Sequence, residues 1–200
     1  LSEGSVYAKK EAGEVKMHFT GSPEHQEVFE HVAETDLSYY EQRFSVKYNI
    51  SFSVQKPSTD TIAADLDNKP FRDNEGKLVF RPGGHGALIE NLNDISADIV
   101  FIKNIDNVVP DGFKCATVIY KKVLAGILVT VQRKIFNYLE IIDKGNYSHE
   151  QIQEMIHFLQ DTLCIKNPET KLLEDAELIL YIKNKLNRPI RVCGMVKNVG

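Results

Sequence analysis

The sequence predicts an α/β fold with a helical stretch inserted before the last strand. Residues 14–20 and 48–55 alternate polar and apolar side chains, which is typical of half-buried strands. Residues 97–103 form a nearly continuous apolar run, as expected for a parallel strand that is covered on both faces. Between these runs, and again after them, apolar side chains recur at helical spacing.

The first helix is expected directly after the first strand. Ser22 and Pro23 offer an N-cap and a proline at the first helical position. Apolar and aromatic side chains then follow at helical spacing: Val28, Phe29, Val32, Leu37, Tyr40 and Phe44. After the second strand, residues 65–77 are charged and turn-rich, which predicts a surface excursion or a small hairpin. Residues 87–92 predict a short helix.

The second half of the chain is predicted to be mainly helical. Pro110 and Asp111 begin the longest helix, and Ser148 to Gln151 read as a capping box for the next one. A third helix opens at residues 167–168 and ends before Pro189. Residues 190–196 predict a last strand. We interpret these helices as structural and assign no chemistry to them.

Composition predicts one cytoplasmic domain. Two hundred residues with 42% hydrophobic and 26% charged side chains suit a single globular domain, residues 1–200. A net charge of −4 without a basic block argues against a nucleic-acid partner. The longest apolar run, residues 123–131, is too short to cross a bilayer, so no membrane partner is expected.

Two further features bear on cellular context. The three cysteines are far apart and not at metal-ligand spacing, so we expect buried thiols in a reducing compartment: Cys115, Cys164 and Cys193. The chain opens on Leu1 rather than on methionine and stops abruptly after a strand-like run. We therefore expect it to be a fragment of a longer protein.

The stretch at residues 80–91, FRPGGHGALIEN, is the strongest candidate for a ligand site. Glycines tolerate positive φ and let a backbone approach a flat ring or a phosphate closely. A helix that follows such a loop presents unpaired N–H groups to an anion. No Gly-Lys-Ser/Thr follows, so this is not a Walker loop. The alternative is a tight turn with a packing histidine.

Two strand ends carry the other candidates. Residues 104–107, Asn-Ile-Asp-Asn, follow the apolar run, and such groups can hold a divalent cation or a ribose hydroxyl. An Asx turn is an equal alternative. Gln55 and Lys56 end the second strand, where a solvated loop is equally possible. His18, His25 and His31 lack ligand spacing, so hydrogen-bonded or solvated histidines are favoured over a metal site.

These three stretches resemble, in their order, the UTP–sugar-1-phosphate uridylyltransferases, also called UDP-sugar pyrophosphorylases. Those enzymes carry a Phe-x-Gln strand end, a Pro-x-Gly-His-Gly loop and an Asn-x-Asp-Asn strand end. Nearly the whole chain also resembles a bacterial family defined by a domain of unknown function (4301). Its members show versions of RPGGHGALIENLN, FIKNIDNVVPD and RPIRVCGMVKN.

The uridylyltransferase resemblance implies a nucleotide-diphospho-sugar transferase fold, a Rossmann-like, mostly parallel sheet with helices on both faces. It also implies a site for a uridine nucleotide and a sugar phosphate. Gln55 would bind the base, Asp106 would bind Mg²⁺, and Lys56 and Lys103 are our candidates for phosphate contacts. The remaining nucleotide-binding residues would be Gly83, Gly84, His85, Gly86 and Asn104.

The reaction implied is attack by a sugar phosphate oxygen on the α-phosphorus of UTP, with release of pyrophosphate. The nucleophile is already an anion, so catalysis would rest on positioning and charge neutralisation. The enzymes of that group also grip the triphosphate with an N-terminal Gly-rich basic loop, which these 200 residues lack. We therefore expect the isolated chain to be inactive. A non-catalytic sugar-nucleotide-binding module and a structural or interaction domain remain alternatives.

Overall fold

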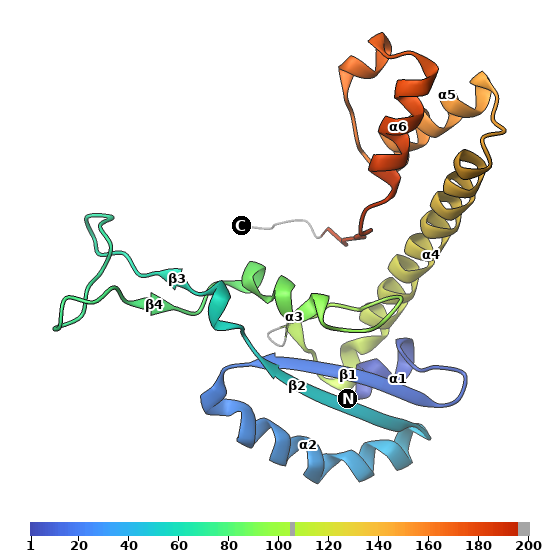
Figure 1. Ribbon diagram of the computed structural model, residues 1–200. Helices are drawn as coiled ribbons and strands as arrows, with labels where there is room; N and C mark the ends of the chain where they lie inside the picture. Colours follow the sequence, from blue (N-terminus) through green and yellow to red (C-terminus); the bar gives the residue numbers. More distant parts are fainter. Residues whose placement is uncertain (105–106, 196–200) are drawn as a thin grey trace. The chain divides into compact units, whose positions relative to one another are not determined.

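The computed structural model describes residues 1–104 and 107–195, and it is a mixed α/β structure (Figure 1). Its contacts divide the chain into two compact units, Leu1–Val118 and Ile119–Gly200. The expectation of one domain over residues 1–200 therefore stays a prediction.

The first unit is built on a β-α-β arrangement. Strands β1 (Glu14–Gly21) and β2 (Lys47–Val54) pair in parallel, and α2 (Pro23–Phe44) connects them. Figure 1 shows α2 running alongside the two strands. Both strands begin and end within one residue of their predicted limits, so alternation in the sequence located them correctly.

The β1–β2 sheet has one apolar and one polar face, as strand alternation requires. Phe19 of β1 stacks on Phe52 of β2, with ring centroids 5.7 Å apart, and lies 6.3 Å from Phe29 of α2. Helix α2 therefore covers the apolar face. The opposite face carries hydroxyl and imidazole groups: His18, Thr20, Ser51 and Ser53.

A short helix, α1 (Ser2–Tyr7), closes the start of the sheet. Val15 and Tyr48, which are partners in the ladder, are the two buried hydrophobic residues of this region. The Tyr48 hydroxyl lies in hydrogen-bond contact with the hydroxyl of Ser5. Gly4 packs against the side chain of Met17, so the helix approaches the strand closely.

Residues 61–81 form a separate arm that extends from the β1–β2 sheet (Figure 1). Strands β3 (Thr61–Ile62) and β4 (Phe80–Arg81) pair antiparallel at its base. Two single bridges, Ala64 to Pro70 and Arg72 to Leu78, continue it outward. Residues 65–77 were predicted to be a surface excursion or a small hairpin; the structure shows an exposed arm with three extended segments, where a simple hairpin has two.

The arm repeats with a period of eight residues. Its three segments form a closed ring of backbone hydrogen bonds, in which Phe71 N–H donates to Ala63, Val79 N–H to Phe71, and Ala63 N–H to Val79. The donor–acceptor distances are 2.7, 3.1 and 2.9 Å. The ring ties each segment to both others, which explains how so short a stretch holds a defined shape without a buried core.

The two turns of the arm are built alike. The Oδ1 atom of Asp65 accepts from the N–H groups of Asp67 and Lys69, and Asp73 does the same for Glu75 and Lys77, all at 2.9 Å. The fourth residue of each turn has a positive φ: 61° at Asn68 and 79° at Gly76. Asn and Gly are the residues that adopt this conformation most readily.

Two predicted strands are wrong. Residues 97–103 form neither strand nor helix, and the described part of the last segment, residues 190–195, is likewise irregular; Val196 lies outside the described residues. The sheet of this unit therefore shows two parallel strands among the described residues, not a Rossmann-like sheet. Residues 97–103 pack instead through side chains, with the Phe101 ring 4.9 Å from that of Tyr7 in α1.

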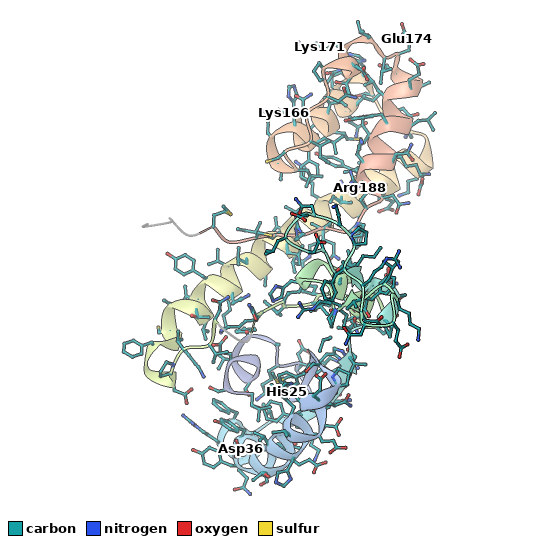
Figure 2. The ribbon with its side chains drawn as sticks, turned by 90° about the vertical axis from the view of Figure 1, so that its left-hand side faces the viewer. His25, Asp36, Lys166, Lys171, Glu174 and Arg188 are labelled. Carbon is teal, nitrogen blue, oxygen red and sulfur yellow. The ribbon has the colours of Figure 1, made fainter. Side chains whose placement is uncertain are left out.

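The second unit is a helical bundle. It holds most of α4 (Lys114–Lys144), α5 (His149–His157) and α6 (Asp175–Leu186), with a π-helical turn at Phe158–Thr162 and a 3₁₀ turn at Pro168–Leu172. Figure 2 shows Lys166, Lys171 and Glu174 on the segment that joins α5 to α6. The buried core consists of Ile135, Tyr138, Ile142, Ile152, Met155, Ile156, Phe158, Leu159, Leu178, Ile179, Ile182 and Leu186.

Helix boundaries in this unit follow the sequence closely. The Ser148 hydroxyl accepts from Gln151 N–H at 3.3 Å, and the Gln151 side chain accepts from Ser148 N–H at 2.9 Å. This confirms the predicted capping box. The third predicted helix is divided, because the 3₁₀ turn ends at Leu172 and α6 begins at Asp175.

Residues Asp111–Lys144 are long and apolar enough to cross a membrane by length and composition, with a mean hydropathy of 1.4 in the most apolar window. None of that window is buried. Lys121 and Lys122 stand within the apolar stretch, and a single such helix is weak support for a span. The cytoplasmic, membrane-free location therefore stays a prediction.

The cysteines correct one expectation. All three are free, as predicted, but all three are exposed and not buried. Cys115 lies in the first turn of α4, and Cys164 follows the π-helical turn with a φ of 55°. Cysteine is usually a buried residue type, but residue type alone does not determine whether a given side chain faces the core or the solvent. The prediction that these three thiols are buried was therefore wrong.

Candidate functional site

The end of β2 and the glycine loop meet in the structure. Gln55 directly follows β2, and its carboxamide lies against the backbone of Gly83. Oriented as the hydrogen-bond network requires, its oxygen accepts from Gly83 N–H at 2.8 Å and its nitrogen donates to the Gly83 carbonyl at 3.2 Å. The opposite orientation would leave only a 3.5 Å contact to Asp60. Two motifs that are 28 residues apart in the chain are therefore joined directly.

Gly83 is required by close packing and not by backbone conformation. A Cβ atom at this position would lie 2.9 Å from the Cβ of Ala87 and 3.0 Å from the carbonyl of Thr59. Gly84 and Gly86 have open space at the same position, and none of the three has a positive φ. The loop thus uses one glycine to pack closely against Thr59 and Gln55, which follow β2, and leaves the other two open to solvent.

Asn91 makes a second connection between the loop and the strand. This residue of α3 (Ile89–Asn93) is only 4% exposed. Its Nδ2 donates to the Ser53 hydroxyl at 3.0 Å and to the Val54 carbonyl at 2.8 Å. Its Oδ1 is buried and has no hydrogen-bond donor among the described residues. The short predicted helix is therefore anchored on the polar face of the sheet.

The same polar face explains the first histidine. His18 lies between two serine hydroxyls, with Nδ1 2.7 Å from Ser51 Oγ and Nε2 2.8 Å from Ser53 Oγ. His25, at the start of α2 (Figure 2), lies 2.7 Å from the Ser22 hydroxyl. Among the described residues no group of three His, Cys, Asp or Glu side chains is placed to hold a metal ion. Hydrogen-bonded histidines, the favoured interpretation, account for both.

The two predicted phosphate-contacting lysines are both paired with carboxylates. Lys56 Nζ lies 2.7 Å from Asp94 Oδ2, which adds a third connection between the strand end and the glycine-loop segment. Lys103 forms an ion pair with Glu3 of α1, and this pair is largely buried. Lys56 therefore belongs to the glycine-loop site, whereas Lys103 is held against α1.

Glu3 organises the surroundings of Lys103. It also accepts a hydrogen bond from the Tyr7 hydroxyl at 3.3 Å, and its own side chain is 9% exposed. Burial, followed by the charge and hydrogen bond of Glu3, raises the pKa of Tyr7 to about 12. Asn104, the residue after Lys103 in the chain, is partly buried. Asp106, the predicted Mg²⁺ ligand, lies outside the described residues.

A hollow of about 620 Å³ lies elsewhere, between α2 and the edge of β2. Its lining includes Glu14, Glu30 and Glu34, together with apolar side chains. Three carboxylates against a single lysine, Lys47, give the hollow a net negative charge, which disfavours a phosphate-bearing ligand. This hollow contains none of the predicted site residues and is not a candidate for the nucleotide.

The model of one protein family, described as Domain of unknown function (DUF4301), matches residues 1–200. The chain belongs to the DUF4301 family. Comparison with curated proteins and with solved structures gave no match. Family membership thus confirms the broader of the two resemblances and assigns no reaction.

Two residues of the candidate stretch in this DUF4301 chain were given no role by the sequence analysis. Asn91 carries the anchoring hydrogen bonds, and the signal for it was present, since an asparagine inside a short amphipathic helix usually has a specific partner. Arg81 precedes the loop with an exposed side chain that forms no ion pair with a described residue. Its position directly before Pro82 was visible in the sequence as a basic lead-in.

Proposed function

We propose that this DUF4301 chain binds a uridine nucleotide and a sugar phosphate at the glycine loop. The corresponding fold would be that of the nucleotide-diphospho-sugar transferases. The observation that supports this is the pairing of Gln55 with Gly83, because it brings together two of the three stretches that resemble uridylyltransferases. The exposed His85, which has no hydrogen-bond partner among the described residues, is available to a phosphate or sugar oxygen.

The activity that goes with this proposal is Mg²⁺-dependent transfer of UMP to a sugar 1-phosphate. The metal would rest on Asp106, outside the described residues, and the described residues gather no set of metal ligands. Their fit to a cation therefore has no geometric support, and Mg²⁺ stays a prediction.

A second function is favoured by the ion pairs of the two lysines that were predicted to contact phosphate. Lys56 and Lys103 are both neutralised by carboxylates, Asp94 and Glu3. A lysine held in this way stabilises a developing phosphate charge less well than a free one. This observation supports a non-catalytic sugar-nucleotide-binding module, which would bind the nucleotide without exchanging pyrophosphate.

The test is a titration of the ¹⁵N-labelled chain with UMP and with AMP, followed by NMR. We expect weak binding that favours UMP, with shifts at Gly84, His85 and Gly86. Gly86→Ala should fold normally because its Cβ enters open space, and should weaken UMP binding at least about tenfold by blocking backbone approach.

The matched control is Gly112→Ala, since Gly112 also has open space around its Cβ and lies in a 3₁₀ turn away from the loop. Its UMP affinity should equal that of the wild type. If Gly86→Ala also binds UMP as the wild type does, the glycine loop is not the ligand surface. If no nucleotide shifts any resonance, the chain is a structural or interaction domain.

A further inference from the structure

The carboxamide of Gln55 is already engaged. A glutamine side chain recognises a base edge through its oxygen and one adjacent N–H, used together. In this structure that same pair of atoms contacts the N–H and the carbonyl of Gly83, at 2.8 and 3.2 Å. The Gln55 oxygen also accepts a hydrogen bond from the Thr59 hydroxyl, at 3.2 Å. A uracil ring could pair with Gln55 only if the contact with Gly83 were broken.

Breaking that contact would have structural consequences. A Cβ atom at Gly83 would collide with Ala87 and Thr59. The loop is therefore closely packed against the residues that follow β2. The Gly83 N–H and carbonyl, which are partly shielded from solvent, would both lose their partner, and an unpaired polar group costs more the less water can reach it. The arrangement is therefore that of a structural connection, which a ligand does not displace cheaply.

The connection is one of three in a short stretch of chain. Residues 53–56 contact the glycine-loop segment at Gly83 through Gln55, at Asn91 through Ser53 and Val54, and at Asp94 through Lys56. Four consecutive residues thus fasten both ends of residues 83–94. The part between, Gly84 to Gly86, remains exposed.

We propose that Gln55 is a positioning residue, which holds the glycine loop at the end of β2 and does not read the base. This inference rests on the proposed nucleotide site and refines it, since base preference then comes from the exposed loop. The glycine at 83 and the amide at 55 act as one unit. Removing the amide should release the loop whether or not a ligand is present.

The first arm of the test needs no ligand. In Gln55→Ala we expect hydrogen exchange at the Gly83 amide to accelerate at least about tenfold, because its acceptor is gone. Gln42→Ala, which changes an exposed glutamine of α2, is the matched control and should leave that rate unchanged. Unchanged exchange at Gly83 in Gln55→Ala would overturn the proposal.

The second arm separates positioning from base reading. Gln55→Glu keeps an acceptor for the Gly83 N–H but has no N–H to donate. A base-reading residue so changed would move preference from UMP towards CMP, whose amino group suits a carboxylate. A positioning residue would weaken both nucleotides by the same factor, with their affinity ratio unchanged, and a shift towards CMP would overturn the proposal.

The two arms keep the proposals distinguishable. If the wild type binds neither UMP nor CMP, the proposed nucleotide function fails. The exchange rate at Gly83 then decides by itself whether Gln55 holds the loop.

Discussion

At the scale of single residues, the ion pair between Glu3 and Lys103 decides how one predicted site residue behaves. The Glu3 side chain is 9% exposed and that of Lys103 is 19% exposed, so neither charge is well hydrated. Removal of one partner from such a pair leaves the other charge buried without compensation. Lys103 is thus bound to the first helix by electrostatics.

Glu3→Gln tests this directly. We expect the free energy of unfolding to fall by about 3 kcal/mol, measured by urea denaturation, because Lys103 loses its anion. The pKa of Tyr7 should fall from about 12 but stay above its ordinary value, since burial is the largest cause of the shift and remains. An NMR titration of the Tyr7 ring measures it.

The pH dependence follows from the sign of that shift. A raised pKa favours the neutral phenol in the folded state, so its contribution to stability is complete below the unfolded pKa of about 10. It is lost as the pH rises through about 12. In Glu3→Gln this loss should end at lower pH. Glu11→Gln, at an exposed position, is the control, and an unchanged Tyr7 pKa in Glu3→Gln would contradict the assignment.

Residue types in the sequence identified the glycine loop but not what its residues do. Gly83 and Gln55 were singled out, and the structure places them in contact. Both residues were predicted to contact a nucleotide, whereas in the structure they contact each other. The carboxylate partners of the lysines were not foreseeable, because Glu3 is 100 residues from Lys103 and nothing local couples them.

At the scale of elements, the sequence pattern correctly located those elements whose signals lie within a few neighbouring residues. Strands β1 and β2 and the capping box of α5 were all predicted, since alternation and capping act over a few residues. Residues 97–103 were misassigned because a strand also needs a neighbour to pair with, which no local pattern reveals. The eight-residue repeat of the arm was not predicted, although it also spaces the apolar residues Ala63, Phe71 and Val79, because a period of eight matches neither a helix nor a strand.

The arm gives a prediction about its two turns. Gly76 has a φ of 79° and nothing within 4 Å of an added Cβ, so Gly76→Ala is penalised by backbone conformation alone. We expect a loss of about 1 kcal/mol. Faster hydrogen exchange at the ring amides of Ala63, Phe71 and Val79 would report it. Asn68→Gly, at the equivalent position, should leave those rates equal or slower.

The control for the arm is Gly84→Ala, which has the same open surroundings but a φ of −70°. It should leave the three ring amides unchanged. Equal exchange in Gly76→Ala and Gly84→Ala would mean that the ring does not depend on the left-handed turn residue.

At the scale of the whole molecule, the two units have unequal cores. The second unit buries a continuous cluster of hydrophobic side chains from α4, α5, the π-helical turn and α6. Within the described part of the first unit, the buried hydrophobic residues are Val15 and Tyr48. Local stability follows buried apolar area, so the units should differ in resistance to opening.

We therefore expect amides of α5 and α6 to exchange more slowly than those of β1 and β2. Met155→Ala, which empties a position that is 1% exposed, should cost about 3 kcal/mol and speed exchange about 100-fold in α5 and α6. Val28→Ala, at a position 62% exposed, is the control. Slower exchange in β1 than in α6 of the wild type would contradict this ranking.

The hydrogen-bond ring of the arm also bears on the order in which the chain folds. Its donors and acceptors lie eight or sixteen residues apart, whereas cross-strand partners such as His18 and Ser51 lie 33 residues apart. Closing short loops is fast, and hairpins form within about 1–10 μs, while pairing of parallel strands has to wait for a long connection. We expect the arm to be complete before β1 and β2 meet. Gln55 precedes the arm in the sequence and Gly83 follows it. Once the arm has folded, fewer flexible residues separate the two, so the entropy cost of bringing the glycine loop to the end of β2 is smaller.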